Sequence, residues 1–457
     1  MSHPLAGPAD LASDADPASD ADADADADAD AVTAPRAGAV VAVLAFAGIV
    51  VASMQSLVIP LLPELPGLVH ASASGTAWAI TATLLASAIA TPVAGRLGDM
   101  YGKRRMLLAS LGLLVVGSAA AGLSTTLTPL VIGRTLQGLS AGVIPLGISI
   151  MRDELPPERL GSATATMSSS LGVGGALGLP AAALIADHTD WHLLFWISAG
   201  LGVVATALVL RLVPESRART GGRVDLVGAA GLSAVLVCLL LAISQGADWG
   251  WASGRTLGLF VAGVAVLLAW GRWELRARQP LVDLRTSARR QVLVTNLASV
   301  MFGVATMPVR LVQPQILQLP AATGYGLGKS LLVTGLVLTP TGLVMMAVSP
   351  LSARISAARG PKTTLMAGAV VIAAGYALGI GLMSAIWQLM MVTSVIGAGI
   401  GLAYGAMPAL IMAAVPISET GAANSLNSLM RTIGAALLAL AIATLVPRRR
   451  PLVHADA

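Results

Sequence analysis

A cluster of glycine, acidic and basic residues lies between the second and third apolar runs of the chain, where it can form a latch between helices. Its glycines permit a tight turn and a close approach of two helices. Asp99 can pair with a basic residue or cap the N-terminus of a helix, and either contact breaks when that face opens. An ordinary basic loop explains the cations but not an aspartate set among glycines. The predicted gating loop contains Gly95, Asp99, Gly102, Lys103, Arg104 and Arg105.

A second group of informative residues lies inside the fourth apolar run and includes an arginine. Arg134, Gly138 and Gly142 are spaced four residues apart, so they share one helix face, and the glycines mark that face as a close helix contact. An arginine at such a position costs about 2.5–3.5 kcal/mol to insert, so it is rarely without a role. Together with Gln137, Arg134 is therefore either a functional charge or a structural arginine bonded to backbone carbonyls.

The fifth apolar run contains a glycine-rich segment that ends in a proline. Small residues let helix backbones approach closely, and a proline inside a helix predicts a kink. The segment is therefore predicted to be a kinked packing helix. Its marker residues are Gly174, Gly175, Gly178 and Pro180.

Few other polar side chains lie within the apolar runs, and these are candidates for lining a central cavity. Arg310 has no acidic partner within the runs, so it either meets an anionic group of a substrate or extends to water at the outer interface. The other candidates are Gln55, Gln313, Asn424, Asn427 and Arg431. No Asp or Glu lies deep inside any run, and no catalytic or metal-binding cluster is visible, so we predict that the protein is not an enzyme.

These residues belong to a strongly apolar chain of 457 residues, of which 56% are hydrophobic and 11% charged, with a mean hydropathy of +0.81. A soluble core of this length cannot hide so much apolar surface, and soluble domains carry about 25% charged residues. The basic excess lies in short clusters between apolar runs, which is typical of membrane topology and not of nucleic-acid binding. The single cysteine, Cys238, excludes a disulfide framework.

Thirteen apolar runs are long enough to cross a bilayer, and each is predicted to be a helix because a helix satisfies its own backbone polar groups in lipid. They lie near 38–62, 76–96, 105–123, 127–150, 162–186, 191–212, 225–245, 255–272, 291–318, 330–352, 363–383, 387–415 and 421–446. With a cytoplasmic N-terminus, the inside loops carry nineteen Lys and Arg and the outside loops two, which sets the orientation. The C-terminus is then expected outside the cytoplasm.

The chain divides into five predicted segments. Residues 1–36 hold nine aspartates, mostly alternating with alanine, and have no apolar face to bury, so they are predicted to form a disordered cytoplasmic tail. The others are a six-helix N-terminal half at 37–213, an inserted two-helix segment with basic loops at 214–290, a five-helix C-terminal half at 291–446 and a short tail at 447–457.

An internal repeat relates the two halves. The matching positions are Pro92 with Pro350, Gly102 with Gly360, Gly138 with Gly401, Gly142 with Gly405, and Gly174 with Gly434. Parallel repeats describe transporters whose halves rock about a central site. The second half lacks a counterpart of the sixth helix. The sequence therefore indicates either a truncated or frameshifted fourteen-span ancestor or a true thirteen-span protein with an outside tail.

The gating loop resembles the signature loop of the major facilitator superfamily, and residues from about 38 to 446 are similar to its fourteen-span drug:proton antiporters. The Arg134 segment resembles the second motif of that superfamily, which implies a part in proton or charge coupling. The Gly174 segment is similar to the antiporter motif, although Ala181 and Ala182 replace glycines. Members of the subgroup commonly have an aspartate in the first span. Met54 stands there in this chain, so a buried carboxylate is not available at this predicted cavity position.

We therefore predict an all-α integral membrane protein with two parallel-repeat helical bundles of the major facilitator type and about thirteen transmembrane helices, arranged as six, two inserted and five. The resemblance implies a secondary transporter in the bacterial plasma membrane that exports lipophilic or amphipathic molecules, such as drugs or antibiotics, in exchange for protons. The alternatives are a facilitator or importer of a small organic solute, and a transport-inactive sensor or scaffold. The expected partners are the bilayer and a small-molecule substrate, without cofactor, metal or nucleic acid, and a monomer is the default.

Overall fold

The computed structural model describes residues 17–59, 61–62, 64–216, 221, 224–324 and 326–445. All regular structure within these ranges is helical, as predicted. Twelve helical segments are long and apolar enough to cross a membrane. The apolar runs of the sequence therefore form helices that can satisfy their own backbone polar groups in lipid.

The first half of the chain forms one helical bundle. Its long helices are α1 (Pro17–Ser56), α4 (Trp78–Tyr101), α5 (Lys103–Gly122), α6 (Leu127–Gly138), α7 (Val143–Glu154), α8 (Pro157–His188) and α9 (His192–Leu212). α6 and α7 make one crossing through the 3-10 helix η1 (Leu139–Gly142). The short helices α2 (Leu65–Leu68) and α3 (Ala73–Thr76) connect α1 to α4.

The second bundle follows two inserted helices, α10 (Leu226–Trp249) and α11 (Gly254–Glu274). Its long helices are α13 (Arg290–Gln318), α14 (Leu331–Ala347), α15 (Ser349–Arg359), α16 (Pro361–Gly381), α17 (Ile386–Met412) and α18 (Thr420–Leu445). α14 and α15 together make one crossing. Short helices α12 (Leu284–Ser287), η2 (Ala321–Thr323) and η3 (Ile417–Glu419) lie between the long ones.

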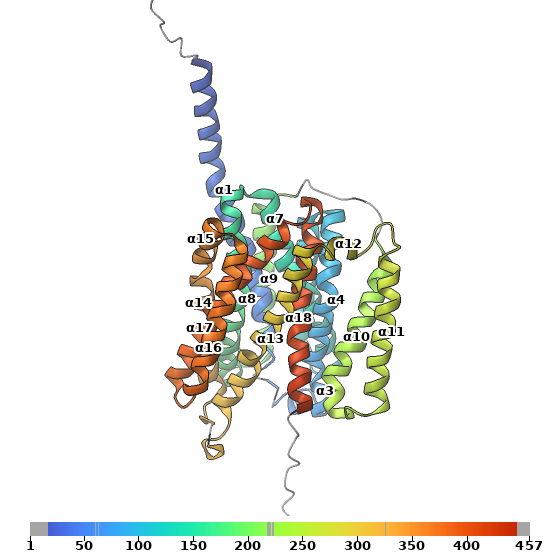
Figure 1. Ribbon diagram of the computed structural model, residues 1–457. Helices are drawn as coiled ribbons and strands as arrows, with labels where there is room; N and C mark the ends of the chain where they lie inside the picture. Colours follow the sequence, from blue (N-terminus) through green and yellow to red (C-terminus); the bar gives the residue numbers. More distant parts are fainter. Residues whose placement is uncertain are drawn as a thin grey trace, which may run out of the picture.

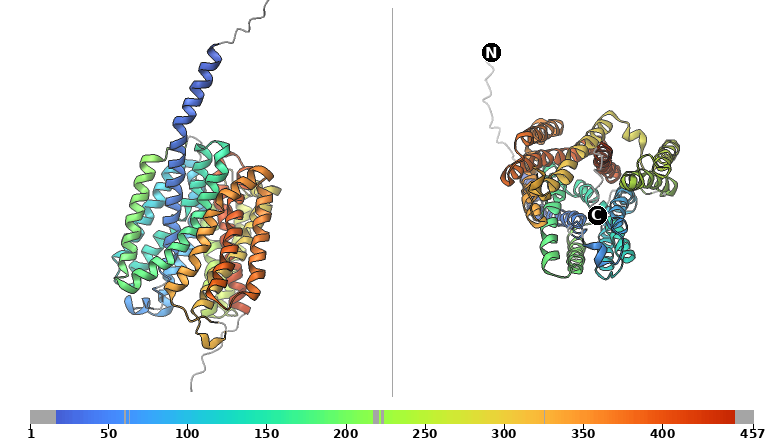
Figure 2. Two further views of the ribbon diagram at one scale, coloured as in Figure 1. Left: turned by 90° about the vertical axis from the view of Figure 1, so that its left-hand side faces the viewer. Right: turned by 90° about the horizontal axis from the view of Figure 1, so that it is seen from below.

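The two bundles stand side by side, and α10 and α11 lie at one edge of the molecule (Figures 1 and 2). α8 packs along α14 and α4 packs along α18, so these two pairs join the halves. α10 contacts both α4 and α18, which places the insertion against one of these junctions. Of the twelve apolar crossings, the one formed by α17 is the most buried and α11 is the most exposed.

One of the thirteen predicted spans is not among the twelve apolar crossings. The segment predicted at 421–446 forms α18, a helix of 26 residues. Its first three turns carry polar side chains, among them Asn424, Ser425 and Asn427, which are buried against other helices and do not meet lipid. α18 therefore runs as an interior helix of lower hydropathy. It ends at the face opposite the one from which α1 projects (Figure 1).

The start of α1 also differs from the prediction. α1 is one helix of 40 residues that begins at Pro17 and projects from the bundle (Figure 1), whereas the sequence predicts disorder for residues 1–36. Alanine has the highest helix propensity, and extension of an existing helix needs no new nucleus. These two effects favour helix in the Asp-Ala repeat. Residues 1–16 and the predicted tail at 447–457 lie outside the described residues.

The predicted gating loop is a single-residue break between two helices. α4 continues to Tyr101 and α5 begins at Lys103, so Gly102 makes the reversal, with φ 118° and ψ 126°. The repeat-related Gly360 separates α15 from α16 with φ 83° and ψ 152°. Residues with a side chain rarely adopt these angles. The internal repeat is thus visible in backbone geometry as well as in sequence.

We expect Gly303→Ala to destabilise the second half, because α13 and α18 touch backbone to backbone at this glycine. A Cβ at residue 303 would lie 2.1 Å from the carbonyl oxygen of Arg431, so one helix must shift. Overpacking of this kind costs about 1–3 kcal/mol, and the detergent-solubilised variant should melt at a lower temperature. Gly200→Ala makes the same change in α9, where nothing lies within 4 Å of the added Cβ. Equal melting temperatures for the two variants would contradict this packing.

Candidate functional site

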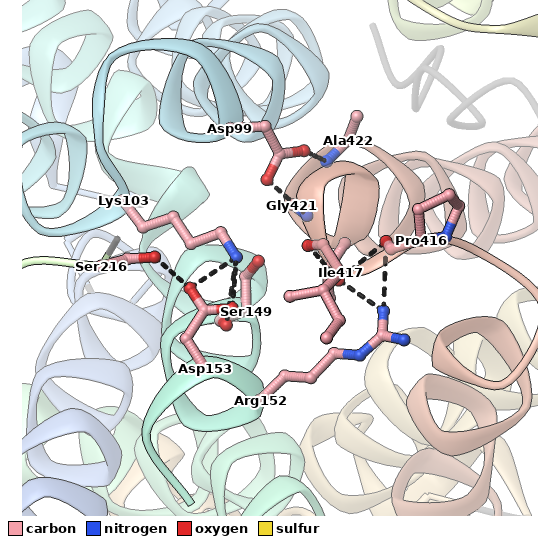
Figure 3. Close-up of polar contacts among 11 residues, drawn as sticks. Asp99, Lys103, Ser149, Arg152, Asp153, Ser216, Pro416, Ile417, Gly421 and Ala422 are labelled. Atoms are coloured by element: carbon pink, nitrogen blue, oxygen red, sulfur yellow. Dashed lines mark hydrogen bonds and ion pairs between the residues drawn. The ribbon is translucent and has the colours of Figure 1, made fainter. Parts of the chain in front are cut away.

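Asp99 joins the two halves (Figure 3), at the face from which α1 projects (Figure 1). It lies in the last turn of α4, is fully buried, and accepts hydrogen bonds from the backbone N–H groups of Gly421 at 3.0 Å and Ala422 at 2.7 Å. These N–H groups belong to the first turn of α18, where helix donors lack intrahelical partners and carry a partial positive charge. Of the two partners considered for Asp99, the helix N-terminus is therefore the one observed in these hydrogen bonds.

A close crossing of α4 and α18 allows this contact. A Cβ at Gly421 would lie 2.7 Å from Oδ1 of Asp99 and 2.8 Å from the carbonyl oxygen of Gly95. A Cβ at Gly95 would lie 2.1 Å from the hydroxyl of Ser425. Neither glycine leaves room for a side chain, so the two backbones come close enough for the carboxylate to reach the N–H groups of α18.

The basic residues of the predicted gating loop tie α5 to the rest of the first half. Lys103 is fully buried, and its Nζ lies 2.7 Å from Oδ2 of Asp153 in α7. Arg104 donates to a carbonyl in the last turns of α9 at 2.6 Å. Arg105 is 68% exposed and lies 3.6 Å from Glu215, a geometry that contributes little at a surface. Of these three basic residues, Lys103 is therefore the one that forms a buried ion pair.

Arg152 is a second link between the halves, and in the sequence it is only one of the nineteen basic residues of the inside loops. Its guanidinium donates to the carbonyls of Met412 at 2.6 Å and Val415 at 3.0 Å, and to the hydroxyl of Thr420 at 2.5 Å. It also reaches the carbonyl of Pro416, as Figure 3 shows. The acceptors extend from the last residue of α17 to the first residue of α18, a segment whose carbonyls lack helix partners. Because the partners are mostly backbone atoms, residue types alone do not predict them.

Arg134 is enclosed within the first half and is 1% exposed. Its Nη1 donates to the carbonyl of Met54 at 2.9 Å and to Oε1 of Gln137 at 2.8 Å, and its Nε donates to the carbonyl of Ala79 at 3.3 Å. Gln137 in turn donates to the hydroxyl of Ser118 at 2.8 Å. These contacts are those of a structural arginine bonded to backbone carbonyls. Its part in coupling stays a prediction.

The glycines that follow Arg134 lie on a helix contact, as predicted. A Cβ at Gly138 would lie 2.4 Å from the carbonyl oxygen of Thr83, and one at Gly142 would lie 2.5 Å from Cβ of Ala94. Both neighbours belong to α4. The face that carries Arg134 is therefore pressed against α4.

Two of the three marker glycines in the fifth span lie on a contact with α1. A Cβ at Gly174 would lie 2.6 Å from the carbonyl oxygen of Ile49, and one at Gly178 would lie 2.4 Å from the hydroxyl of Ser56. Gly175 differs, because nothing lies within 4 Å of the corresponding position. Pro180 lies inside α8 and packs against Gly335 of α14, so this segment also contributes to the junction between the halves.

The other predicted cavity residues differ in exposure, and three of them lie together on the last helix. Arg310 is exposed and lies eight residues before the end of α13, so both of its roles stay predictions. Gln55 is half-buried. Gln313 is 5% exposed, and its Oε1 has no hydrogen-bond partner among the residues that the structure describes. The remaining three, Asn424, Asn427 and Arg431, share one face of α18.

The shared face of α18 forms a polar cluster with α13 and α17. Asn427 donates to Oδ1 of Asn296 at 3.0 Å and to the hydroxyl of Ser299 at 2.7 Å. Arg431 donates to Oδ1 of Asn427 at 2.8 Å, and its guanidinium carbon lies 4.8 Å from the ring centre of Tyr404. The structure thus brings together the predicted cavity residues of the last helix.

Comparisons with known proteins agree with this architecture. A family model described as Major Facilitator Superfamily matches residues 44–439. Multidrug resistance protein 3 of Bacillus subtilis (strain 168) is 26% identical over 370 residues, which cover 79% of this chain and 70% of the relative. The Tetracenomycin C resistance and export protein of Streptomyces glaucescens is 28% identical over 240 residues, which cover 52% of this chain and only 45% of that relative.

A solved structure supports the same fold. The proton:xylose symporter XylE matches with a TM-score of 0.64 at 14% sequence identity, and the match covers 90% of this chain and 89% of that chain. At this level of identity the likeness concerns the arrangement of helices alone.

We expect Asp99→Asn to loosen the contact between the halves, because a neutral amide is a weaker acceptor for backbone N–H groups than a carboxylate. Nitroxide labels on Tyr101 and Ile417, both exposed near this contact, report the distance across it in a Cys238→Ser background by double electron–electron resonance. The expected result is a new population at longer distances.

Asp190→Asn is the matched control for this measurement. Asp190 lies between α8 and α9, and hydrogen bonds from the backbone N–H and the ring of His192 hold its pKa below the ordinary value. The control therefore removes the same negative charge at neutral pH from a site outside the contact between the halves. An Asp99→Asn distribution identical to that of the control would show that the carboxylate does not hold this face closed.

Proposed function

The chain belongs to the Major Facilitator Superfamily, and we propose from this premise that it exports lipophilic or amphipathic small molecules by alternating access. Family membership makes it a multi-pass membrane transporter of small molecules. Relatives named for multidrug resistance, and for tetracenomycin C resistance and export, support the outward direction and drug-like substrates.

One observation carries the proposal. At the face that holds Asp99, the halves are joined by side chains that bind helix ends, and both links converge on the segment from the end of α17 to the first turn of α18. Separating the halves at this face breaks both links together, which is the behaviour needed of a gate. A hydrogen bond to a charged group contributes about 1.5–3 kcal/mol, so such a gate is firm when closed and still reversible.

We further propose that protons drive export and that Asp99 is the coupling acid. Met54 occupies the place where the resemblance puts an aspartate, so the first span has no carboxylate there. Protonation turns Asp99 from a charged acceptor into a weaker neutral one, which favours release of the α18 N-terminus. The positive-inside pattern supports placing this gate, and the start of α1, on the cytoplasmic side of a bacterial plasma membrane.

A pump-deficient bacterial host that expresses the chain is expected to extrude at least one dye from a panel of cationic, neutral and anionic fluorescent amphipaths. A protonophore should abolish that extrusion. Dye fluorescence over time gives the rate, and immunoblots of membranes give the amount of protein. Extrusion that persists with the protonophore would reject the proton-coupling proposal and leave the export proposal intact. Net uptake would favour an importer. No transport of any dye by protein present in the membrane would favour the sensor or scaffold alternative.

Asp99→Asn is expected to slow extrusion of an exported dye by about ten-fold, with the protein still present in the membrane. The neutral amide destabilises the state that is closed at this face by about 1.4 kcal/mol, which lowers the population of that state, and with it the rate of the outward step, roughly ten-fold. Asp190→Asn should extrude the dye like the wild type. Normal turnover in Asp99→Asn would remove this residue from the gating mechanism.

A further inference from the structure

Arg431 is a charged residue near the middle of the membrane, on a helix that touches both halves. α18 contacts α13 and α17 of its own half and α4 and α7 of the other half. Arg431 lies about 16 Å along α18 from Thr420, near half of a hydrocarbon thickness of about 30 Å. A charge at this depth usually serves a substrate or ion pathway, because the membrane strongly disfavours it there.

The partners of Arg431 within the protein are all neutral. Nη1 donates to Oδ1 of Asn427 at 2.8 Å, Nη2 donates to the hydroxyl of Ser428 at 3.1 Å, and the ring of Tyr404 lies beneath the guanidinium. None of the ion pairs found in the described part of the chain includes Arg431. A guanidinium has five N–H donors, so the two hydrogen bonds leave donors free for a ligand.

The surroundings hold this guanidinium in place. Asn427 is fixed by its own hydrogen bonds to Asn296 and Ser299, which direct its Oδ1 to Arg431. Asn424, two turns toward the gate on the same face, is 4% exposed. Within the described ranges neither its side-chain nitrogen nor its oxygen has a partner, so this amide is an unpaired polar group on the face that carries Arg431. Buried polar groups without partners are rare in folded proteins and call for an explanation.

Arg134 provides the contrast within the same protein. It is 1% exposed and directs its donors to two carbonyls and to Gln137, so its side chain is enclosed. Arg431 is half-buried and remains accessible. Both charges are positive and neither has a carboxylate among its hydrogen-bond partners. Of the two arginines, Arg431 is therefore the one that can take up a ligand.

We propose that Arg431, with Tyr404 and Asn424, recognises the anionic group of an amphipathic organic anion, such as a carboxylate or sulfonate. This deepens the proposed function, since it rests on the chain being an exporter and names the substrate class. A planar guanidinium pairs with such groups through two parallel hydrogen bonds, and the ring of Tyr404 keeps it oriented. The same positive charge disfavours a cationic substrate at this site.

Two dyes with one ring skeleton test the charge preference. Fluorescein is anionic and rhodamine 6G is cationic, and binding of each to the purified full chain in detergent is measured by fluorescence anisotropy. The wild type is expected to bind fluorescein more tightly. Arg431→Gln should weaken fluorescein binding about ten-fold or more, because a charge-assisted contact is lost, and Arg431→Lys should lie between the two. Arg255→Gln removes the same charge from an exposed residue of α11 and should bind fluorescein like the wild type.

Asn427→Asp gives an independent, nearly isosteric test. It places a carboxylate where Oδ1 of Asn427 now accepts from Arg431 at 2.8 Å, and so neutralises the arginine in place. Fluorescein affinity should fall at least ten-fold, and rhodamine 6G affinity should stay equal or rise. If Arg431→Gln does not fold, Arg431→Lys and Asn427→Asp decide the question, with melting temperatures as the check on folding.

Three outcomes would overturn the proposal in distinguishable ways. A wild type that binds rhodamine 6G but not fluorescein refutes the anion site and leaves the export proposal intact. Folded variants that lose both dyes equally refute a charge-recognition role for Arg431. A wild type that binds neither dye, and extrudes no dye in cells, counts against the anion site and against export together.

Discussion

Charged side chains that bind helix ends hold the two halves of this protein together. In lipid, free backbone N–H and C=O groups occur only where helices end or break. Asp99 takes N–H groups at the start of α18, and Arg152 takes carbonyls at the end of α17. Each pairing has the sign that the helix dipole favours, with the negative group at an N-terminus and the positive group at a C-terminus.

The two links bind on either side of one short connection, and this makes the closed face a single unit. η3 (Ile417–Glu419) lies between α17 and α18, so Asp99 and Arg152 hold it from two elements of the first half, α4 and α7. The buried pair of Lys103 and Asp153 ties α5 to α7 in the same half. A motion that separates the halves at this face thus moves α17 and α18 together against a first half that is braced internally.

The sequence predicts those features that depend on composition, length and periodicity. Nearly all of the apolar runs form helices in the structure, and the repeat reappears in the backbone angles of Gly102 and Gly360. An aspartate among glycines predicts a contact with a basic residue or with a helix N-terminus, and the sequence leaves both open; the hydrogen bonds of Asp99 are to a helix N-terminus. Arg152 escaped prediction because its acceptors are mainly backbone atoms more than 250 residues away. The same reason hides the polar interior of α18, whose buried partners lie on α13 and α17.

Arg134 and Arg431 show two ways in which the chain accommodates a positive charge inside the membrane. Burial of a charge in the membrane is costly, and for Arg134 carbonyl oxygens offset that cost. Arg431 has fewer hydrogen bonds within the protein, so an organic anion would supply acceptors for its remaining N–H donors. A carboxylate in place of Met54 would add a negative charge at the residue whose backbone carbonyl already binds Arg134, and this would make that part of the membrane interior less attractive to an anion. Under the anion proposal, Met54 and the free N–H donors of Arg431 both leave positive charge available inside the membrane. The acid proposed to couple transport to protons, Asp99, then lies at the gate and not beside these arginines.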